Sequence, residues 1–318
     1  MILVCGEALI DMFVHNTPDG ELVTQPVMGG SPYNVATGLA RLGTKTGFLG
    51  GLSKDAFGVA LTRLLEREGI DLGYSPRLTN PSTLSIVSLD AAGVPTYRFI
   101  GEGAADRALT VADLPASLSG DVAALTFGSL SLGVEPTGST MLALAQREKG
   151  KRVISVDPNL RASVVGDIGR WKVRQEGIIA CANIVKASVE DIAGTYGTGA
   201  PVDEIAKDWL KLGPSLVIVT RGDEGSIAYH AAGHQIETSG RRVKVIDTVG
   251  AGDTFHAALL NHLEVTGKLT PPAIAGLGHD ELAKSLNFAA AAAAVTCTRR
   301  GADMPRAADV AAELARSA

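Results

Sequence analysis

The hydrophobic positions of this chain fall into two recurring patterns. Short, continuous apolar runs are typical of strands buried on both faces, and apolar residues every three or four positions are typical of amphipathic helices. The first pattern predicts strands at residues 2–5, 123–127, 153–157, 184–186 and 216–220, and the second predicts helices at residues 31–42, 53–68, 137–148 and 202–212. Their alternation, without a long linker or repeat, predicts one α/β domain over residues 1–318, with a mostly parallel central sheet and helices on both faces.

The first two helices carry local start and stop signals. We expect Ser31 to be the N-cap of the first helix, Pro32 to lie in its first turn, and Gly43 to end it. Gly69 is expected to end the second helix.

Two segments instead alternate apolar and polar residues around turn signals, which is typical of β-hairpins. One hairpin is predicted at about residues 11–27, around the turn TPDG at 17–20, and the other at about residues 85–100, around AAG at 91–93. We expect them to form a small β-sheet that projects from the body as a lid. The open edges of such a sheet suggest, as a hypothesis, a homodimer formed through the lid.

The composition of the chain argues against several classes of protein. Hydrophobic residues make up 46% of the chain, so a large core is expected, and the net charge of −5 argues against a nucleic-acid or anionic membrane partner. The three cysteines, Cys5, Cys181 and Cys297, show no metal-binding spacing and predict free thiols. The apolar run at 288–297 is about half a membrane span, and no basic leader precedes Glu7, so we expect a cytoplasmic protein.

A glycine-rich segment, DTVGAGDTF at residues 247–255, carries the strongest chemical signal. Backbone amides freed by Gly250 and Gly252 at the start of a helix can bind an anion, because the helix dipole adds about half a positive charge there. Asp253 beside them could accept a proton from a hydroxyl that attacks a bound phosphate, or it could cap the helix. The segment therefore predicts a phosphate site next to a carboxylate.

Polar clusters follow three predicted strands: DPNLR at 157–161, KAS at 186–188 and TRGD at 220–223. Ligands of parallel α/β sheets bind beyond the carboxyl ends of the strands, so these clusters should share one rim with residues 250–253. This shared rim favours catalysis over capping for Asp253.

Two other nucleotide-binding motifs are incomplete in this chain. The segment GLARLGTKT at 38–46 has Thr44 where a P-loop needs lysine, and it lies at a predicted helix end. The Gly250-Ala251-Gly252 turn lacks the third glycine of a dinucleotide fingerprint, which argues against a dehydrogenase.

Two motifs together carry a family resemblance: GGSPYNVA at 29–36 and DTVGAGDT at 247–254. Their order and separation resemble the ribokinase-like (PfkB) carbohydrate kinases, and the DPNLR motif and residues 101–107 make the chain most similar to the bacterial fructokinases of that family. The resemblance implies transfer of the ATP γ-phosphoryl group to a primary hydroxyl, with D-fructose as the first choice of acceptor. 2-Keto-3-deoxygluconate, ribose, a nucleoside or an already phosphorylated sugar stay open as acceptors, and a non-catalytic sugar or nucleotide sensor is the alternative from a different class.

The resemblance also implies roles for individual residues around the sugar. Asp253 corresponds to the catalytic base, and Gly250, Ala251 and Gly252 correspond to the anion hole. The residues implied to hold the sugar are Asp11, Gly29, Gly30 and Asn34; a polar residue satisfied inside its helix is the other interpretation of Asn34. Arg98 and Arg161 are the candidates that set sugar choice, because a guanidinium binds hydroxyls, carboxylates and phosphates alike.

For the nucleotide, the resemblance implies Thr220, Gly222 and Gly225 at the phosphates and Asn287 near the adenine. Lys186 either faces the phosphates or is a solvated strand-end lysine. Magnesium is expected to be held through water by Asp191 or Glu190. Potassium activation is a hypothesis from the resemblance, with the ion beside the anion hole; the candidate residues are Asp247, Val249 and Gly301.

Overall fold

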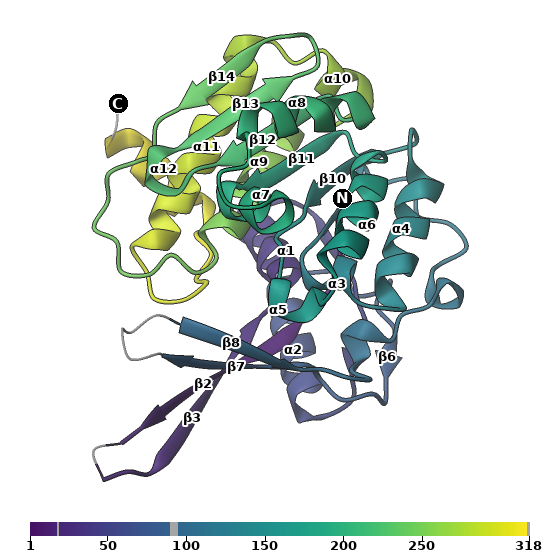
Figure 1. Ribbon diagram of the computed structural model, residues 1–318, viewed down its shortest axis with the longest axis vertical. Coiled ribbons are helices and arrows are strands. Elements are labelled where there is room, and N and C mark those ends of the chain that lie inside the picture. Colours follow the sequence, from purple (N-terminus) through teal and green to yellow (C-terminus); the bar gives the residue numbers. More distant parts are fainter. Residues whose placement is uncertain (18, 90–94, 317–318) are drawn as a thin grey trace.

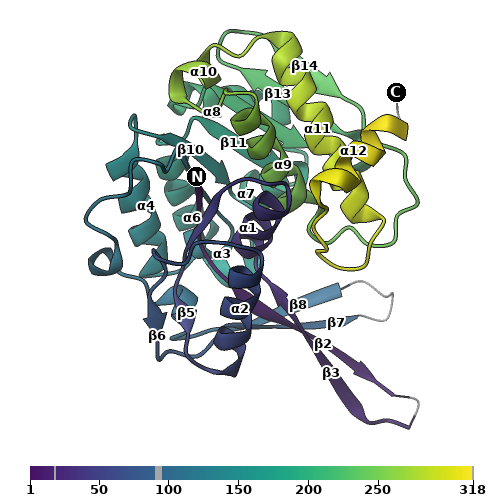
Figure 2. The same ribbon diagram turned by 180° about the vertical axis from the view of Figure 1, so that it is seen from behind.

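A computed structural model describes residues 1–17, 19–89 and 95–316, and its centre is a twisted sheet flanked by two helical layers (Figures 1 and 2). Within these residues the sheet has eight strands in the order β14-β13-β12-β11-β10-β9-β1-β4, of which β13 and β14 run antiparallel to their neighbours. The strands are β1 Ile2–Cys5, β4 Thr46–Leu49, β9 Ala124–Gly128, β10 Val153–Asp157, β11 Ile184–Ser188, β12 Leu216–Thr220, β13 Ser226–His230 and β14 Gln235–Thr238. The expected mostly parallel sheet is therefore confirmed.

Each face of this sheet has its own hydrophobic core, because successive side chains of a strand point to opposite faces. Ile2 and Val4 of β1 pack into one core, and Leu3 and Cys5 pack into the other. The first core is covered by α1 Ser31–Arg41, α2 Ala56–Arg67, α9 Ala251–Val265, α10 Pro271–Ala275, α11 His279–Cys297 and α12 Ala307–Arg316. The second is covered by α3 Leu130–Gly133, α4 Thr137–Glu148, α6 Ile168–Ile179, α7 Val189–Tyr196 and α8 Val202–Leu212.

A separate four-stranded sheet projects from the body below α5 Ala162–Val165 (Figure 1). Its strands are β2 Leu9–Asn16, β3 Leu22–Gly29, β7 Leu84–Leu89 and β8 Pro95–Ile100, in the order β3-β2-β7-β8. Both predicted hairpins are present, and a parallel pairing of β2 with β7 joins them into the small sheet. Pro18 in the first predicted turn and the whole AAG turn at 91–93 lie outside the described residues. A two-stranded pair, β5 Leu52–Ser53 and β6 Arg77–Leu78, completes the strands.

One predicted helix cap, at Ser31, and one predicted helix start, at Ser53, are wrong. The cap position of α1 is Gly30, with φ 104°, and Ser31 is already helical, with its hydroxyl directed to another helix. The second helix begins at Ala56, because Asp55 caps it by accepting from the Gly58 amide at 2.7 Å, and Ser53 lies in β5. Strands β4, β5, β6, β13 and β14 were not predicted.

Residues 38–46 run from the end of α1 into β4, which is the reverse of the strand-to-helix order of a P-loop. Cys5, Cys181 and Cys297 are free thiols. No helix in the described part of the chain is long and apolar enough to cross a membrane.

Candidate active site

A cavity of about 710 Å³ opens at the carboxyl ends of the parallel strands, between the start of α9, the wall of α11 and the small sheet. It gathers side chains from the three polar clusters that follow β10, β11 and β12, so the predicted shared rim is confirmed. The predicted site residues that line it are Asp11, Gly30, Asn34, Arg161, Lys186, Glu190, Asp191, Thr220, Gly222, Gly225, Val249, Gly250, Ala251, Gly252 and Asp253. Gly29, Arg98, Asp247, Asn287 and Gly301 are not among the lining residues.

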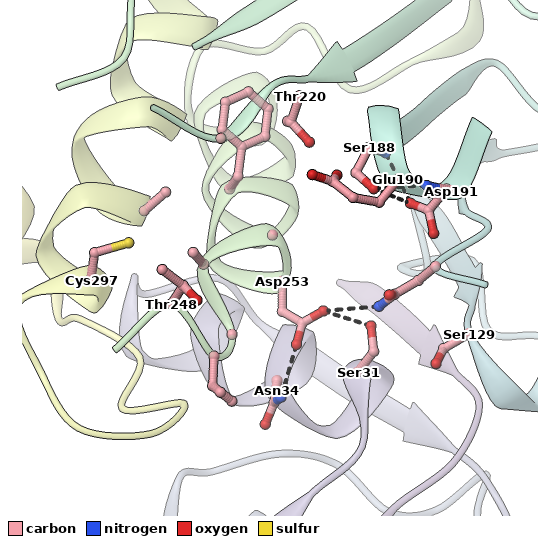
Figure 3. A pocket seen from close by; sticks show the side chains of 18 of the residues that line it. Ser31, Asn34, Ser129, Ser188, Glu190, Asp191, Thr220, Thr248, Asp253 and Cys297 are labelled. Atoms are coloured by element: carbon pink, nitrogen blue, oxygen red, sulfur yellow. Dashed lines mark hydrogen bonds between the residues drawn. The ribbon is translucent and has the colours of Figure 1, made fainter. Parts of the chain in front are cut away.

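Asp253 lies in the first turn of α9 and is held by side chains from outside its own helix. Figure 3 shows its carboxylate facing Ser31 and Asn34 of α1. The Ser31 hydroxyl donates to Oδ1 at 2.6 Å, and the Asn34 amide donates to Oδ2 at 2.8 Å. Asn159 Nδ2 lies 3.5 Å from Oδ1. Asp253 therefore does not cap α9, and the carboxylate is only 7% exposed but faces the cavity.

The start of α9 is built around Gly250. This residue has a left-handed φ of 78°, and a Cβ there would lie 2.7 Å from Met304 Cε and 2.8 Å from Ala302 Cβ, so only glycine fits. The Ala251 amide donates to the Thr248 carbonyl at 3.2 Å. The following amides lie in the first turn, where helical N–H groups have no partner within the helix, and the helix mouth therefore suits an anion.

Lys186 lies under this helix mouth. It is 3% exposed, and its ammonium pairs with Asp157 Oδ2 at 2.7 Å, so the solvated-lysine interpretation is wrong. A Cβ placed on Gly252 would lie 3.1 Å from Lys186 Nζ, which locates the ammonium against the first turn of α9. Burial lowers the pKa of Lys186, but the attraction of Asp157 outweighs it and holds the pKa above its usual value. The Lys186 ammonium thus lies where its positive charge can add to that of the helix dipole, next to its counter-charge on Asp157.

Asp11 of β2 and Gly30 form the side of the cavity beneath the small sheet, and Gly29 lies next to Asp11 without lining the cavity. A Cβ on Gly29 would lie 2.2 Å from Asp11 Oδ2, so Gly29 makes room for this carboxylate. Burial raises the pKa of Asp11, while Ser85 and Arg161 oppose the shift. Gly30, with φ 104°, brings the backbone to the cavity wall.

The sequence prediction places Arg98 at the sugar, but Arg98 does not line the cavity. Its neighbours Tyr97 and Phe99 line the cavity, and because strand side chains alternate between faces, Arg98 lies on the opposite, exposed face of β8. The small sheet instead covers the cavity with apolar side chains: Leu9, Phe13, Tyr97 and Phe99.

Glu190 and Asp191, adjacent in sequence, have different surroundings. Asp191 Oδ2 accepts from the Ser188 amide and hydroxyl, each at 2.9 Å, and Oδ1 accepts from the Leu160 amide at 2.7 Å. Asp191 thereby completes the cap of α7 and anchors the DPNLR segment. Figure 3 shows the exposed Glu190 carboxylate pointing into the cavity. Among the described residues, no three His, Cys, Asp or Glu side chains are grouped closely enough to hold a metal ion directly.

Asp247 connects the two segments predicted to surround a monovalent cation. Its Oδ1 accepts from the Val249 amide at 3.1 Å, and its Oδ2 accepts from the Gly301 amide at 2.8 Å. The carbonyl of Cys297 accepts from the Ile246 amide at 2.8 Å, which brings the end of α11 to the same place. The segments lie side by side, although only Val249 of the three predicted residues lines the cavity.

The far end of the cavity is apolar. Its walls are Ala290, Ala293 and Ala294 of α11, with Val243 and Val245, whereas Cys297 at the end of α11 and Phe255 of α9 line the cavity nearer the helix mouth. Asn287, expected near the adenine, is one helical turn before Ala290, but its Oδ1 accepts a hydrogen bond from Arg241 Nη2 at 2.7 Å. It is Arg241 that lines the cavity.

Several polar residues of the cavity had no site role in the sequence prediction, among them Glu7, Ser31, Asn159 and Arg241. Ser31 was interpreted as a helix cap, while Asn159 and Arg241 had no role assigned. Glu7, 1% exposed, also lines the cavity and accepts from the Ser131 amide at 3.0 Å, and burial raises its pKa. Ser31 and Asn159 carried a usable signal, since they belong to the GGSPYNVA and DPNLR motifs.

Comparisons with known proteins agree with this architecture. A family model described as "pfkB family carbohydrate kinase" matches residues 1–308. The chain is 40% identical to a fructokinase of Rhizobium leguminosarum bv. trifolii over 282 residues, covering 89% of this chain and 85% of the relative. The solved structure of a fructokinase with bound ATP from Xylella fastidiosa superposes with a TM-score of 0.91 at 26% identity, covering 99% of this chain and 98% of the other. A fructokinase from Vibrio cholerae O395 in a fructose, ADP and calcium ion bound form gives a TM-score of 0.82 at 26% identity, covering 98% of each chain.

The parallel sheet with two helical layers and a small projecting sheet is thus the fold of the ribokinase-like kinases. The chain belongs to the pfkB family of carbohydrate kinases. It is accordingly an enzyme that phosphorylates a carbohydrate.

Proposed function

We propose that this carbohydrate kinase transfers the γ-phosphoryl group of ATP to a primary hydroxyl of D-fructose, forming fructose 6-phosphate. One observation carries the proposal: the Asp253 carboxylate, oriented by Ser31 and Asn34, faces a cavity at the start of α9. The similarity to fructokinases, including one solved with fructose and ADP, supports fructose as the acceptor.

Asp253 acts as the base. The sugar oxygen forms a bond to the γ-phosphorus, the bond from that phosphorus to the ADP oxygen breaks, and the hydroxyl proton passes to Asp253. Because both carboxylate oxygens accept hydrogen bonds from α1, the side chain is already oriented when substrates bind. Gly250, Ala251 and Gly252 form the anion hole, and Lys186 adds a positive charge that stabilises the transferring group.

The sugar lies beneath the small sheet, which acts as the lid. Asp11 accepts hydrogen bonds from sugar hydroxyls, Asn34 uses its carbonyl oxygen in the same way, and Gly30 presents backbone close to the ring. Arg161, on the opposite side of the cavity, donates hydrogen bonds to the sugar hydroxyls. The aromatic lid residues exclude water, which otherwise competes as the phosphoryl acceptor.

The nucleotide phosphates lie along the turn after β12, beside Thr220. Gly222 and Gly225 have left-handed φ values of 60° and 95°, and a Cβ on Gly225 would lie 1.9 Å from the Thr238 carbonyl oxygen. This turn therefore needs glycine and leaves its backbone open to phosphate oxygens. The donor set fits magnesium held mainly through water, with Glu190 facing the cavity and Asp191 fixing the adjacent loop. When bound, the magnesium ion neutralises charge on the phosphates.

A monovalent cation fits beside the anion hole. Asp247 holds the turn ending at Val249 against the loop at Gly301, and backbone carbonyls of these two segments are the proposed ligands of the ion. Potassium activation is therefore part of the proposal.

A panel assay of coupled ADP release tests the reaction and the acceptor together. We expect D-fructose to give the highest kcat/KM among ketoses, aldoses, keto-deoxy acids, phosphorylated sugars and nucleosides. A higher kcat/KM with 2-keto-3-deoxygluconate or ribose would replace fructose as the acceptor, and ADP release with none of them would contradict the proposal.

We also propose that two copies of the chain associate through their lid sheets. The edge strands β3 and β8 expose Leu22 and Ile100, which are 69% and 58% accessible. Sedimentation is expected to show a dimer, and a monomer at all working concentrations would contradict this association.

A further inference from the structure

The two ends of the cavity are separated along α11. The Thr254 and Thr296 hydroxyls are hydrogen-bonded at 2.8 Å, and His262 Nδ1 lies 3.1 Å from Ser285 Oγ, so α9 and α11 pack antiparallel. The C-terminal end of α11 is therefore beside the anion hole. Asn287, nine residues before Thr296, lies about 14 Å away along the helix axis, at a rise of about 1.5 Å per residue. A group at Asn287 is too far from the helix mouth to contact the transferring phosphoryl group.

The wall between these ends suits a flat apolar group. Ala290, Ala293 and Ala294 present only methyl groups from α11, and Val243 and Val245 add branched side chains from the segment after β14. Such a slot can accommodate an aromatic ring but offers it no hydrogen bonds. Polar recognition must come from the end of the slot.

Arg241 supplies the polar group at that end. It lines the cavity, yet its side chain is only 12% exposed. Its Nη2 donates to Asn287 Oδ1 at 2.7 Å, and its Nη1 lies 3.7 Å from Glu313 Oε1 of α12. The backbone before it is also restrained, because a Cβ on Gly240 would lie 1.9 Å from the Asp223 carbonyl oxygen. The guanidinium is thus held from two helices before any ligand binds.

We propose that Arg241 binds the purine base of the nucleotide and that Asn287 is a positioning residue acting through Arg241; this inference rests on the proposed ATP-dependent function. A planar guanidinium stacks on the face of a purine ring and is attracted to its π-electrons. Because Asn287 and Glu313 already orient the Arg241 guanidinium, binding the purine base costs little further side-chain entropy.

Calorimetric titration of the full chain with ADP and, separately, with inorganic tripolyphosphate tests the inference. Arg241→Ala is expected to weaken ADP binding about 5- to 30-fold, the range for a desolvated cation–π contact, and to leave tripolyphosphate binding unchanged. Arg242→Ala removes the same charge from the adjacent exposed position and is the matched control. Asn287→Ala is expected to weaken ADP binding less, and the double variant should bind ADP like Arg241→Ala alone.

The possible results separate the interpretations. Equal weakening of ADP and tripolyphosphate binding by Arg241→Ala would assign Arg241 to the phosphates and overturn the inference, as would unchanged ADP binding. Additive effects of Arg241→Ala and Asn287→Ala would refute action through Arg241. If Arg241→Ala does not fold, Arg241→Lys keeps the charge beside Glu313 and should still lose ADP affinity selectively. Failure of the wild-type chain to bind ADP would instead contradict the proposed function.

Discussion

The two ends of the cavity are built differently. At the mouth of α9, the polar side chains hold one another: Asp253 accepts from Ser31 and Asn34, and Lys186 pairs with Asp157. At the α11 end, the wall is alanine and valine, with Arg241 as the charged group. The side chains at the mouth of α9 hold charges where the phosphoryl group would be transferred. The side chains at the α11 end form an apolar wall against which a purine base can pack. Substitutions at the first end should therefore change turnover, whereas substitutions at the second should change affinity.

Replacement of Asp253 by asparagine should cause the greatest loss of turnover. The amide keeps the size of the side chain but cannot take the hydroxyl proton, so kcat should fall by about 10²- to 10⁴-fold. Steady-state kinetics with titration of sugar and ATP would show binding retained. Asp280→Asn, a first-turn acid of α11 that lies at the surface, serves as the control. Near-normal turnover of Asp253→Asn would remove its assigned role.

Lys186→Met is expected to reduce kcat by about 10²- to 10³-fold, because one preorganised charge is lost from the transition state. This variant also leaves Asp157 buried and unpaired, which should destabilise the fold. The double variant Lys186→Met, Asp157→Asn removes both charges and separates the two effects. It should regain thermal stability without regaining turnover, and recovery of kcat would show that Lys186 is purely structural.

Arg161→Ala and Arg98→Ala form a matched pair that tests which rim contacts the sugar. Arg161 lines the cavity, so its loss should raise the fructose KM about 10-fold, the effect of a hydrogen bond to a charged group. Arg98 lies on the outer face of β8, so its loss should leave KM unchanged. A larger KM effect at Arg98 than at Arg161 would show that the lid face has been assigned incorrectly.

The smallest expected effect is that of the monovalent cation. Turnover should be several-fold higher in potassium than in sodium or tetramethylammonium buffers, because the ion adds positive charge next to the anion hole without contacting the substrates. The measurement is kcat in each of the three buffers at the same ionic strength. Equal rates in the three buffers would exclude the cation site between Val249 and Gly301.

Much of the fold could be predicted because its signals are local. Continuous apolar runs give strands β10 and β12 with their observed bounds, and 3.6-residue periodicity does the same for α4 and α8. Strands β13 and β14 were missed: β14 is exposed at alternate positions and short, and its pairing with β13 is decided by the sheet edge. Ser31 shows the limit of local rules, because it has the sequence of a cap but its hydroxyl donates to a carboxylate 222 residues away.

The candidate site shows the same difference between residues with local sequence signals and residues placed by tertiary contacts. Local pattern and chain order were enough to locate the helix mouth at Gly250, the carboxylate beside it and the rim of strand ends, because they specify a glycine-dependent turn and the polarity of a parallel sheet. The folded structure was needed to show that Lys186 is buried against Asp157, that Arg98 faces away, and that Asn287 contacts Arg241. These outcomes depend on side-chain direction and on partners distant in the chain, which hydrophobic periodicity does not encode.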